Sequence, residues 1–162
     1  MTEEFYFFWK HRLSQWHMAD FVVDGVKYCC AEQYMMSEKA RLFGDFKSVE
    51  KIMATNSPRE HQALGRKVTG FNLEIWERKA RDIVFKGNLA LFTQNEDQKQ
   101  LLLSTYPYTL VEASPYDVVW GIGLAADDSR AKNRATWRGK NWLGEVLTAV
   151  RAEIQKAERS DS

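Results

Sequence analysis

The chain has 162 residues and carries 23 Lys and Arg side chains against 22 Asp and Glu, a formal net charge of +1. With 44% hydrophobic and 28% charged residues it has the composition of a folded globular protein, which excludes a disordered chain and gives no support for a strongly basic nucleic-acid binder. We expect one domain over residues 1–157 and a disordered tail at residues 158–162.

The N-terminus and the cysteines indicate a cytoplasmic protein. "MTEEFYFFWKHR" begins with acidic residues and has only a short aromatic run, so it does not resemble a signal peptide, and no apolar stretch approaches the roughly 20 residues that span a bilayer. Cys29 and Cys30 are adjacent. Neighbouring cysteines rarely form a structural disulfide, and two ligands do not make a zinc site. We therefore expect a reducing compartment, no membrane association and no metal.

The first third of the chain predicts short strands followed by two helices. Aromatic and β-branched residues in "FYFFW", "DFVV" and "VKYCC" indicate strands between residues 5 and 30, with Asp24 and Gly25 at a hairpin turn. A helix is expected from about Ala31 to Phe43, and a shorter one should end near Ala54.

The rest of the chain is predicted to be mainly helical. Ser57 with Pro58 directly after it and Glu60 three residues on is a sequence signature of a helix start. Asn72 is expected to cap a long periodic helix, and another helix should start at Asn95. The last helix is expected from Asn141 to about Lys156. The predicted fold class is α+β, a predominantly helical single domain with a small antiparallel sheet.

The predicted helix at residues 31–43 carries two charges at the centre of its apolar face. On a wheel of about 100° per residue, Lys39 lies within about 20° of Glu32, on the stripe that also carries Met36. One explanation is structural, because Glu32 favours the helix dipole and Lys39 extends along apolar surface to solvent. The other is a polar pocket in which a partly desolvated Lys39 has a lowered pKa and becomes a nucleophile. The opposite face is expected to carry Gln33, Ser37, Glu38 and Arg41.

A second candidate site lies in the aperiodic stretch "EASPYDVVWGIG". Glu112 and Asp117 flank a turn, Trp120 offers a flat apolar face, and Gly121 and Gly123 permit close approach of backbone to a ligand. Long ordered loops of this kind are often functional, although each residue also has a structural explanation. The Gly-x-Gly spacing is too short for a dinucleotide-binding fingerprint.

A third candidate is the segment "WRGKNWLG". Gly139, Lys140 and Asn141 lead into a helix, where free backbone N–H groups, the helix dipole and a cation predict an anion-binding site. The structural alternative is a helix start capped by Asn141. The three histidines are scattered without a nucleophile or metal-ligand motif, so no catalytic triad and no metal or other cofactor is expected.

Taken together, these segments resemble the NADAR domain, also called the YbiA-like family. The resemblance rests on the ordered series "LSQW", "VDGVKYCCAEQYMMSEKARLFGD", "ALGRKVTGF", "KGNLALFTQN", "LLLST", "LVEASPYDVVWGIGL" and "WRGKNWLGEVL", from about Phe7 to Arg151. One departure is Gln15, where the family more often has Asn.

The resemblance implies N-glycosidase chemistry on ribosides. Family members are associated with removing ADP-ribose from guanine bases of nucleic acid, and with cleaving a phosphoribosylated intermediate of riboflavin synthesis. The family's glutamate and lysine on the first long helix match Glu32 and Lys39, and the lysine is implied as a covalent catalyst. The expected partner is therefore an ADP-ribose-containing ligand or ADP-ribosylated nucleic acid.

The residues themselves fit this chemistry. A neutral Lys39 amine can attack the anomeric carbon and hold the opened ribose as an imine, while Glu32 or Asp117 moves protons. Trp120 would stack on a base. Phosphate would be bound by Lys140 with the backbone of residues 139–141, or by Arg66.

Two other classes compete with this hypothesis. A non-catalytic reader of ADP-ribose would keep Trp120 and the anion-binding segment but would not need Lys39 on an apolar face. A purely structural protein would need neither. We favour the enzyme, with ADP-ribosylated guanine as its substrate.

Overall fold

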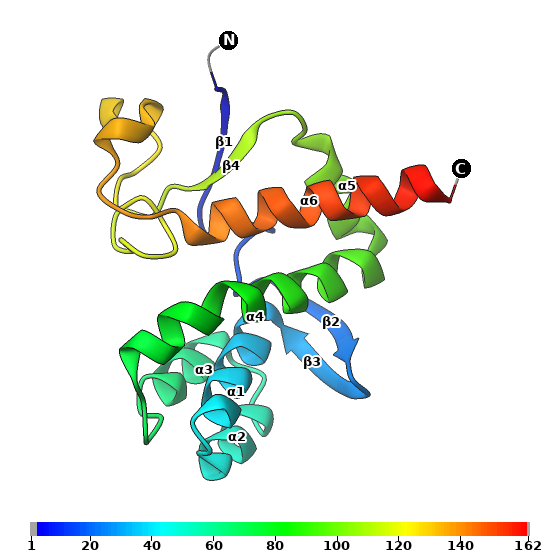
Figure 1. The fold of residues 1–162 in the computed structure, drawn as a ribbon, viewed down its shortest axis with the longest axis vertical. Helices are drawn as coiled ribbons and strands as arrows, with labels where there is room; N and C mark the ends of the chain where they lie inside the picture. The colour runs from blue at the N-terminus through cyan, green and yellow to red at the C-terminus, as the bar shows by residue number, and fades with distance from the viewer. Residues whose placement is uncertain (1–2, 162) are drawn as a thin grey trace. The chain divides into compact units, whose positions relative to one another are not determined.

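The structure, a computed structural model, describes residues 3–161 and is α+β with mainly helical content, as predicted (Figure 1). Among the described residues, no helix is both long enough and apolar enough to cross a membrane. The elements are β1 (Phe5–Phe8), β2 (Met18–Val23), β3 (Val26–Cys30), α1 (Ala31–Leu42), α2 (Phe46–Met53), α3 (Pro58–Gly65), α4 (Leu73–Gln94), α5 (Glu96–Ser104), β4 (Thr109–Glu112), the 3₁₀ turns η1 (Ser129–Lys132) and η2 (Arg134–Thr136), and α6 (Trp142–Ser160).

The chain divides into two compact units, which are described separately. The first, called the α1 unit, is Gln15–Asn95 and holds β2, β3 and α1 to α4. The second, called the α6 unit, is Met1–Ser14 with Glu96–Ser162 and holds β1, α5, β4, the two 3₁₀ turns and α6. Each unit contains one two-stranded sheet.

The antiparallel sheet predicted from the sequence is the β2–β3 hairpin of the α1 unit. Val23 pairs with Val26 across a two-residue turn, in which Asp24 and Gly25 have φ values of 51° and 82°. Positive φ at both central residues is what an Asp-Gly hairpin turn requires. The turn was therefore readable from the dipeptide alone.

Side-chain caps set the starts of two helices where the sequence placed them. The Ser57 hydroxyl accepts the Glu60 N–H at 3.3 Å at the start of α3, and the Asn72 side chain accepts the Ile75 N–H at 3.0 Å at the start of α4. Each cap satisfies one of the N–H groups that a helix leaves without an internal partner.

Helix α1 lies at the centre of its unit. It packs against α2, α3, α4 and β3, and Figure 1 shows α4 lying across it. Residues 31–37 are all buried, so the polar surface expected on the far side of the helix is wrong for Gln33 and Ser37. Gln33 is satisfied internally, because its side chain accepts the Cys29 N–H and donates to the Ile52 carbonyl. Because α1 is packed between several other elements, Gln33 and Ser37 are buried although the amphipathic pattern predicts one exposed face.

Two glycines let helices approach α1 closely. A Cβ atom on Gly87 of α4 would lie 2.3 Å from Cδ1 of Tyr34, and one on Gly65 of α3 would lie 2.0 Å from Sδ of Met36. Both distances are far inside van der Waals contact, so a larger residue would push the helices apart. This role of the two glycines comes from tertiary packing, which local sequence patterns do not encode.

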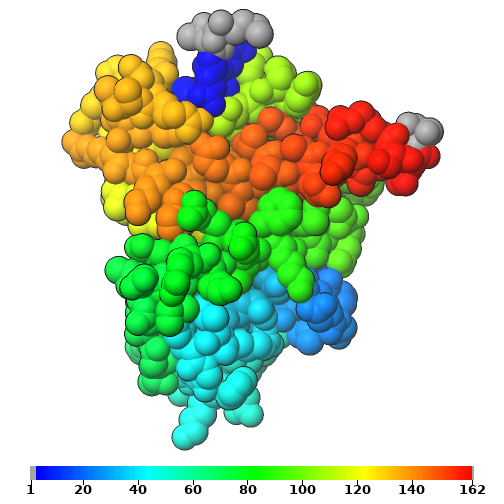
Figure 2. Space-filling model, in the orientation of Figure 1, coloured from blue at the N-terminus to red at the C-terminus, as the bar shows by residue number. Residues whose placement is uncertain are grey.

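In the α6 unit a parallel strand pair packs against α6. β1 pairs with β4 in register from Phe5 opposite Thr109 to Phe8 opposite Glu112, and β4 packs on α6. The loop before α6 (yellow to orange) forms one continuous surface with the helix (orange to red) in Figure 2. This parallel pair was not predicted, because its strands are distant in sequence.

Helix α6 is longer than predicted. It continues to Ser160 instead of ending near Lys156, so residues 158–160 of the predicted disordered tail are helical. The Glu158 carboxylate there lies 3.0 Å from the Lys99 ammonium of α5, a contact that supports the extra turn. Ser162 lies outside the described residues.

Candidate functional site

Lys39 is a half-buried amine held over two aromatic rings. Its Nζ lies 4.8 Å from the ring centre of Phe71 and 5.5 Å from that of Trp76. Trp76 is buried on α4, whereas Phe71, just before that helix, is 43% exposed. The Lys39 side chain therefore packs on two aromatic rings. Its amine lies next to the partly exposed ring of Phe71.

The surroundings of Lys39 change its affinity for a proton. Burial lowers the pKa of the Lys39 amine below its ordinary value, the Glu32 carboxylate opposes that shift, and the positive charge of Arg66 adds to it. A lowered pKa increases the fraction of neutral amine at neutral pH, which is the form that acts as a nucleophile. Glu32 and Arg66, two other predicted site residues of the α1 unit, thus both act on Lys39.

Glu32 is fixed at the buried end of the same helix. It is 6% exposed, and its backbone N–H donates to the Gln15 carbonyl at 2.9 Å. Gln15 in turn exchanges two side-chain hydrogen bonds with the buried Asn88, at 3.1 and 3.2 Å. The residue that departs from the family pattern therefore helps to hold the first turn of α1.

Phe71 and Trp76 were missed as site residues by the sequence reasoning. Trp76 lies in the long helix predicted to start after Asn72, and Phe71 lies just before that helix. The cation–π contacts show that both also define the environment of Lys39. Their proximity to α1 depends on how α4 crosses it, which no local pattern encodes.

The predicted anion-binding segment before α6 is wrong in its backbone component. The N–H groups of residues 139–141 donate to carbonyl groups of residues 118–122, at N···O distances of 2.7–3.1 Å. They are therefore engaged within the protein and do not point at a ligand. The Lys140 side chain remains exposed, with its ammonium 5.2 Å from the ring centre of Trp142.

The glycines of this region serve close backbone packing. A Cβ on Gly139 would lie 2.2 Å from the Gly121 carbonyl oxygen, and one on Gly121 would lie 2.9 Å from that of Asp117. Gly123 has a φ of 71°, which a residue with a side chain rarely adopts. These contacts explain Gly121, Gly123 and Gly139 without a ligand.

Asn141 is committed to the backbone of β4. Its side chain is fully buried, accepts the Glu112 N–H at 2.9 Å and donates to the Leu110 carbonyl at 3.1 Å. Its φ of 55° lies in the left-handed region, and its side chain makes no helix cap. The side chain of Asn141 thus holds β4 and does not form the predicted cap, and its role in ligand binding stays a prediction.

Asp117 and Trp120 lie together in the turn that precedes these contacts. One oxygen of the Asp117 carboxylate accepts the N–H groups of Val119 and Trp120, both at 2.9 Å. The half-buried Trp120 ring meets Trp142 edge to face at a centroid distance of 5.5 Å. Half-buried Glu112 lies at the end of β4, where its carbonyl accepts the Ile122 N–H. Catalysis by Asp117 and ligand binding by Trp120 and Glu112 stay predictions.

The predicted site residues thus form two groups. Lys39, Glu32 and Arg66 belong to the α1 unit, and the remaining eight belong to the α6 unit. Within the α6 unit the structure brings the segments around residues 112–123 and 139–141 together, as the shared hydrogen bonds show.

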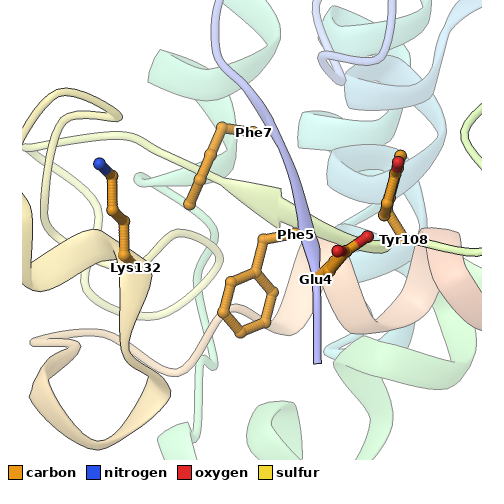
Figure 3. Close-up of a pocket in the computed structure, with 5 residues that line it drawn as sticks. All are labelled: Glu4, Phe5, Phe7, Tyr108 and Lys132. Atoms are coloured by element: carbon orange, nitrogen blue, oxygen red, sulfur yellow. The ribbon is translucent and has the colours of Figure 1, made fainter. Parts of the chain in front are cut away.

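A separate open pocket of about 410 Å³ lies beside β1 in the α6 unit (Figure 3). Phe5 and Phe7 extend from the strand toward Lys132, and Glu4 and Tyr108 complete the lining. Its lining includes none of the residues predicted to bind or react. We do not assign the candidate site to it.

One group of side chains in the α1 unit has the composition of a metal site. Cys29, Cys30 and His61 offer ligand atoms that all lie within 4.8 Å of one another. The expectation that no metal binds rested on the two adjacent cysteines and on histidines that show no metal-ligand motif in the sequence. The third candidate ligand comes from α3, and its proximity is a tertiary effect.

The chain has the fold of a protein of known structure. The NMR structure of the Escherichia coli protein YbiA matches it with a TM-score of 0.78 and 26% sequence identity, covering 98% of this chain and 89% of that one. The architecture of small sheets and six helices is therefore that of a YbiA-like α+β protein.

The chain belongs to the NADAR domain family, whose model matches residues 7–155. It is 44% identical over 151 residues to N-glycosidase R617 of Acanthamoeba polyphaga mimivirus, covering 90% of this chain and 89% of that protein. It is also 44% identical over 131 residues to protein irg-1 of Caenorhabditis elegans, covering 80% of this chain but only 62% of irg-1. A third relative, the chloroplastic riboflavin biosynthesis protein PYRR of Arabidopsis thaliana, is 33% identical over 109 residues, 65% of this chain and 16% of that protein.

The electrostatic coupling of Lys39 predicts opposite effects of two substitutions. Glu32→Gln removes the charge that holds a proton on the amine, so the pKa of Lys39 should fall further. Arg66→Gln removes a repelling charge, so that pKa should rise. NMR titration of ¹³C-labelled lysines would measure both, with Lys51→Gln, an exposed position on α2, as the control that leaves Lys39 unchanged. Shifts of the same sign in both variants would contradict this coupling.

Substitutions of Asn141 and Trp120 should have different effects, the first mainly on the stability of the protein and the second mainly on ligand binding. Asn141→Ala leaves two backbone groups of β4 without partners, so the free energy of unfolding should fall by about 2–5 kcal/mol. Trp120→Ala should destabilise less, but weaken ADP-ribose binding by about 5- to 100-fold through lost stacking. Thermal unfolding and calorimetric titration would measure the two effects. If Trp120→Ala lowers stability and leaves binding intact, Trp120 is a packing residue.

Proposed function

We propose that this protein removes ADP-ribose from ADP-ribosylated guanine bases of nucleic acid, with Lys39 as a covalent catalyst. The family supplies the reaction class, because its members include R617 and YbiA, which are N-glycosidases and thus hydrolases of N-glycosyl bonds. The observation that carries the proposal is the half-buried Lys39 amine over Phe71 and Trp76. A fully exposed lysine would lack the desolvation that is the main cause of the lowered pKa of Lys39.

The proposed reaction begins with attack by the neutral amine. The Lys39 nitrogen forms a bond to the anomeric carbon while the bond from that carbon to guanine breaks, and its electron pair leaves with the base, which takes up a proton. The ribose ring then opens, its ring oxygen gains a proton, and the nitrogen and anomeric carbon form an imine. Water adds to the imine and releases the sugar, which restores the amine.

Glu32 is the carboxylate proposed to assist this sequence. It is buried on the same helix as Lys39, and its charge acts directly on the amine. A carboxylate in that place can accept the proton that the attacking nitrogen loses and return one to the ring oxygen. It also stabilises the positive charge that develops at the anomeric carbon.

Arg66 and Phe71 are proposed to bind the phosphate and a base of the substrate. Arg66 is exposed and close enough to Lys39 to act on its pKa, so a ribose at Lys39 would place its phosphate near a guanidinium. The exposed ring of Phe71 offers a face on which a base can stack. These contacts suit any phosphorylated riboside and do not by themselves select guanine.

Two alternatives are kept for the test. The similarity to PYRR favours a phosphoribosylated intermediate of riboflavin synthesis as the second candidate substrate. A reader of ADP-ribose, the remaining alternative, would bind the ligand without turnover and would not depend on the Lys39 amine.

The experiment compares Lys39→Ala with Lys51→Ala, an exposed lysine on α2, and with Glu32→Gln. Each protein is incubated with an oligonucleotide ADP-ribosylated on guanine, and released ADP-ribose is quantified by chromatography. We expect Lys39→Ala and Glu32→Gln to lose on the order of 10³-fold or more in turnover, with Lys51→Ala unchanged.

The outcomes separate the candidate functions. A folded Lys39→Ala protein with undiminished turnover contradicts covalent catalysis by Lys39. Turnover of the phosphoribosylated intermediate, with none of the oligonucleotide, overturns the substrate but keeps the N-glycosidase. Binding of ADP-ribose without turnover of either substrate identifies a reader.

A further inference from the structure

Three potential metal ligands lie close together, two at the end of β3 and one on α3. The Sγ atoms of Cys29 and Cys30 lie 3.9 Å apart, and Cys30 Sγ lies 3.6 Å from Nδ1 of His61. Cys30 and His61 are fully buried, whereas Cys29 is half-buried. The group is therefore enclosed by the α1 unit but open at one ligand.

The imidazole of His61 is already oriented for coordination. Its Nε2 lies 2.6 Å from the carbonyl oxygen of Thr55, and a carbonyl can only accept, so the ring proton is on Nε2. The lone pair of Nδ1 consequently faces the thiol of Cys30. A backbone carbonyl holding the second ring nitrogen is the usual partner of a metal-bound histidine.

We propose that Cys29, Cys30 and His61 bind one Zn²⁺ ion, with water as the fourth ligand. Two thiolates on a tetrahedral zinc lie about 3.8 Å apart, and a thiolate and an imidazole nitrogen lie about 3.5 Å apart. In the protein the Cys29–Cys30 and Cys30–His61 separations, 3.9 and 3.6 Å, match these values, and Cys29 and His61 lie within 4.8 Å of each other. The inference is independent of the proposed N-glycosidase activity.

The charges at this place suit a divalent cation. Zn²⁺ with two thiolates and a neutral imidazole has no net charge, which favours a site of low dielectric constant. Two carboxylates act on the thiols, Asp20 on Cys29 and Glu32 on Cys30, and both favour a cation. The His61 ring donates from Nε2 to the Thr55 carbonyl and faces Cys30 with Nδ1, so it has a ring nitrogen placed to bind a metal.

The same features disfavour a redox or nucleophilic role for the cysteines. Burial raises the pKa of Cys29 and raises the pKa of Cys30 to about 12. Reactive cysteines require the opposite, a lowered pKa in an electropositive setting. Without a metal both are thiols at neutral pH, and zinc binding therefore releases two protons.

A zinc ion here would tie α3 to the start of α1. Cys30 immediately precedes α1, and Glu32 lies in its first turn. Because the ligands come from β3 and α3, binding should stabilise the folded state and raise the melting temperature with zinc concentration.

The test titrates the reduced protein with Zn²⁺ by calorimetry in buffers of different ionisation enthalpy, and with Co²⁺ by absorption spectroscopy. We expect one ion per chain, two protons released, and a thiolate-to-cobalt charge-transfer band. Cys29→Ser, at the half-buried ligand, should fold and bind at least about 100-fold more weakly, since even outer-shell changes weaken sites by about 10–100-fold. His61→Asn and Cys30→Ser should show the same loss.

His11→Gln, which changes an exposed histidine outside this group, is the matched control and should bind as the original protein does. Circular dichroism would confirm that each variant is folded. The proposal is overturned if the protein takes up no zinc at micromolar concentration, if Cys29→Ser binds zinc unchanged, or if copper(I) binds at this site and zinc does not. In the first two cases the contact between Cys30 and His61 is a thiol-to-imidazole hydrogen bond. In the third case the group is a copper(I) site.

Discussion

The contact of the Lys39 ammonium with Phe71 and Trp76 sets the chemistry available to the α1 unit. Desolvation lowers the pKa of the amine, while the ring faces and the Glu32 carboxylate stabilise its protonated form. The balance leaves an amine that is neutral more often than a surface lysine and remains within reach of solvent. That is the condition for an amine nucleophile in an N-glycosidase that works through an imine.

The burial of α1 makes this placement possible. Its first seven residues are enclosed, and close approaches at Gly65 and Gly87 bring α3 and α4 against it. Buried polar groups such as Gln33 are satisfied by fixed hydrogen bonds, so the helix has little freedom to rotate or slide. Glu32 and Lys39 are therefore held on a rigid element, which positions reacting groups more precisely than a loop does.

The sequence predicted those features that depend on neighbouring residues. The Asp24-Gly25 turn and the caps at Ser57 and Asn72 follow from local backbone preferences, and the charged pair on α1 follows from helical spacing. Features that depend on distant segments were missed or misjudged. The N–H groups of residues 139–141 looked available because their acceptors at residues 118–122 are not adjacent in sequence. His61 was set aside because no local motif accompanies it, and its neighbour Cys30 lies 31 residues away in the sequence. The family resemblance supplied what local patterns could not, namely the reaction class.

The central claim, a covalent role for Lys39, is tested most directly by reductive trapping. The protein is incubated with an oligonucleotide ADP-ribosylated on guanine, borohydride is added, and the modified peptide is identified by mass spectrometry. The account predicts an adduct of the mass of ADP-ribose on Lys39, lost in Lys39→Ala. Release of ADP-ribose with no adduct on Lys39 would contradict it, and would leave the lysine an electrostatic role beside a carboxylate that activates water.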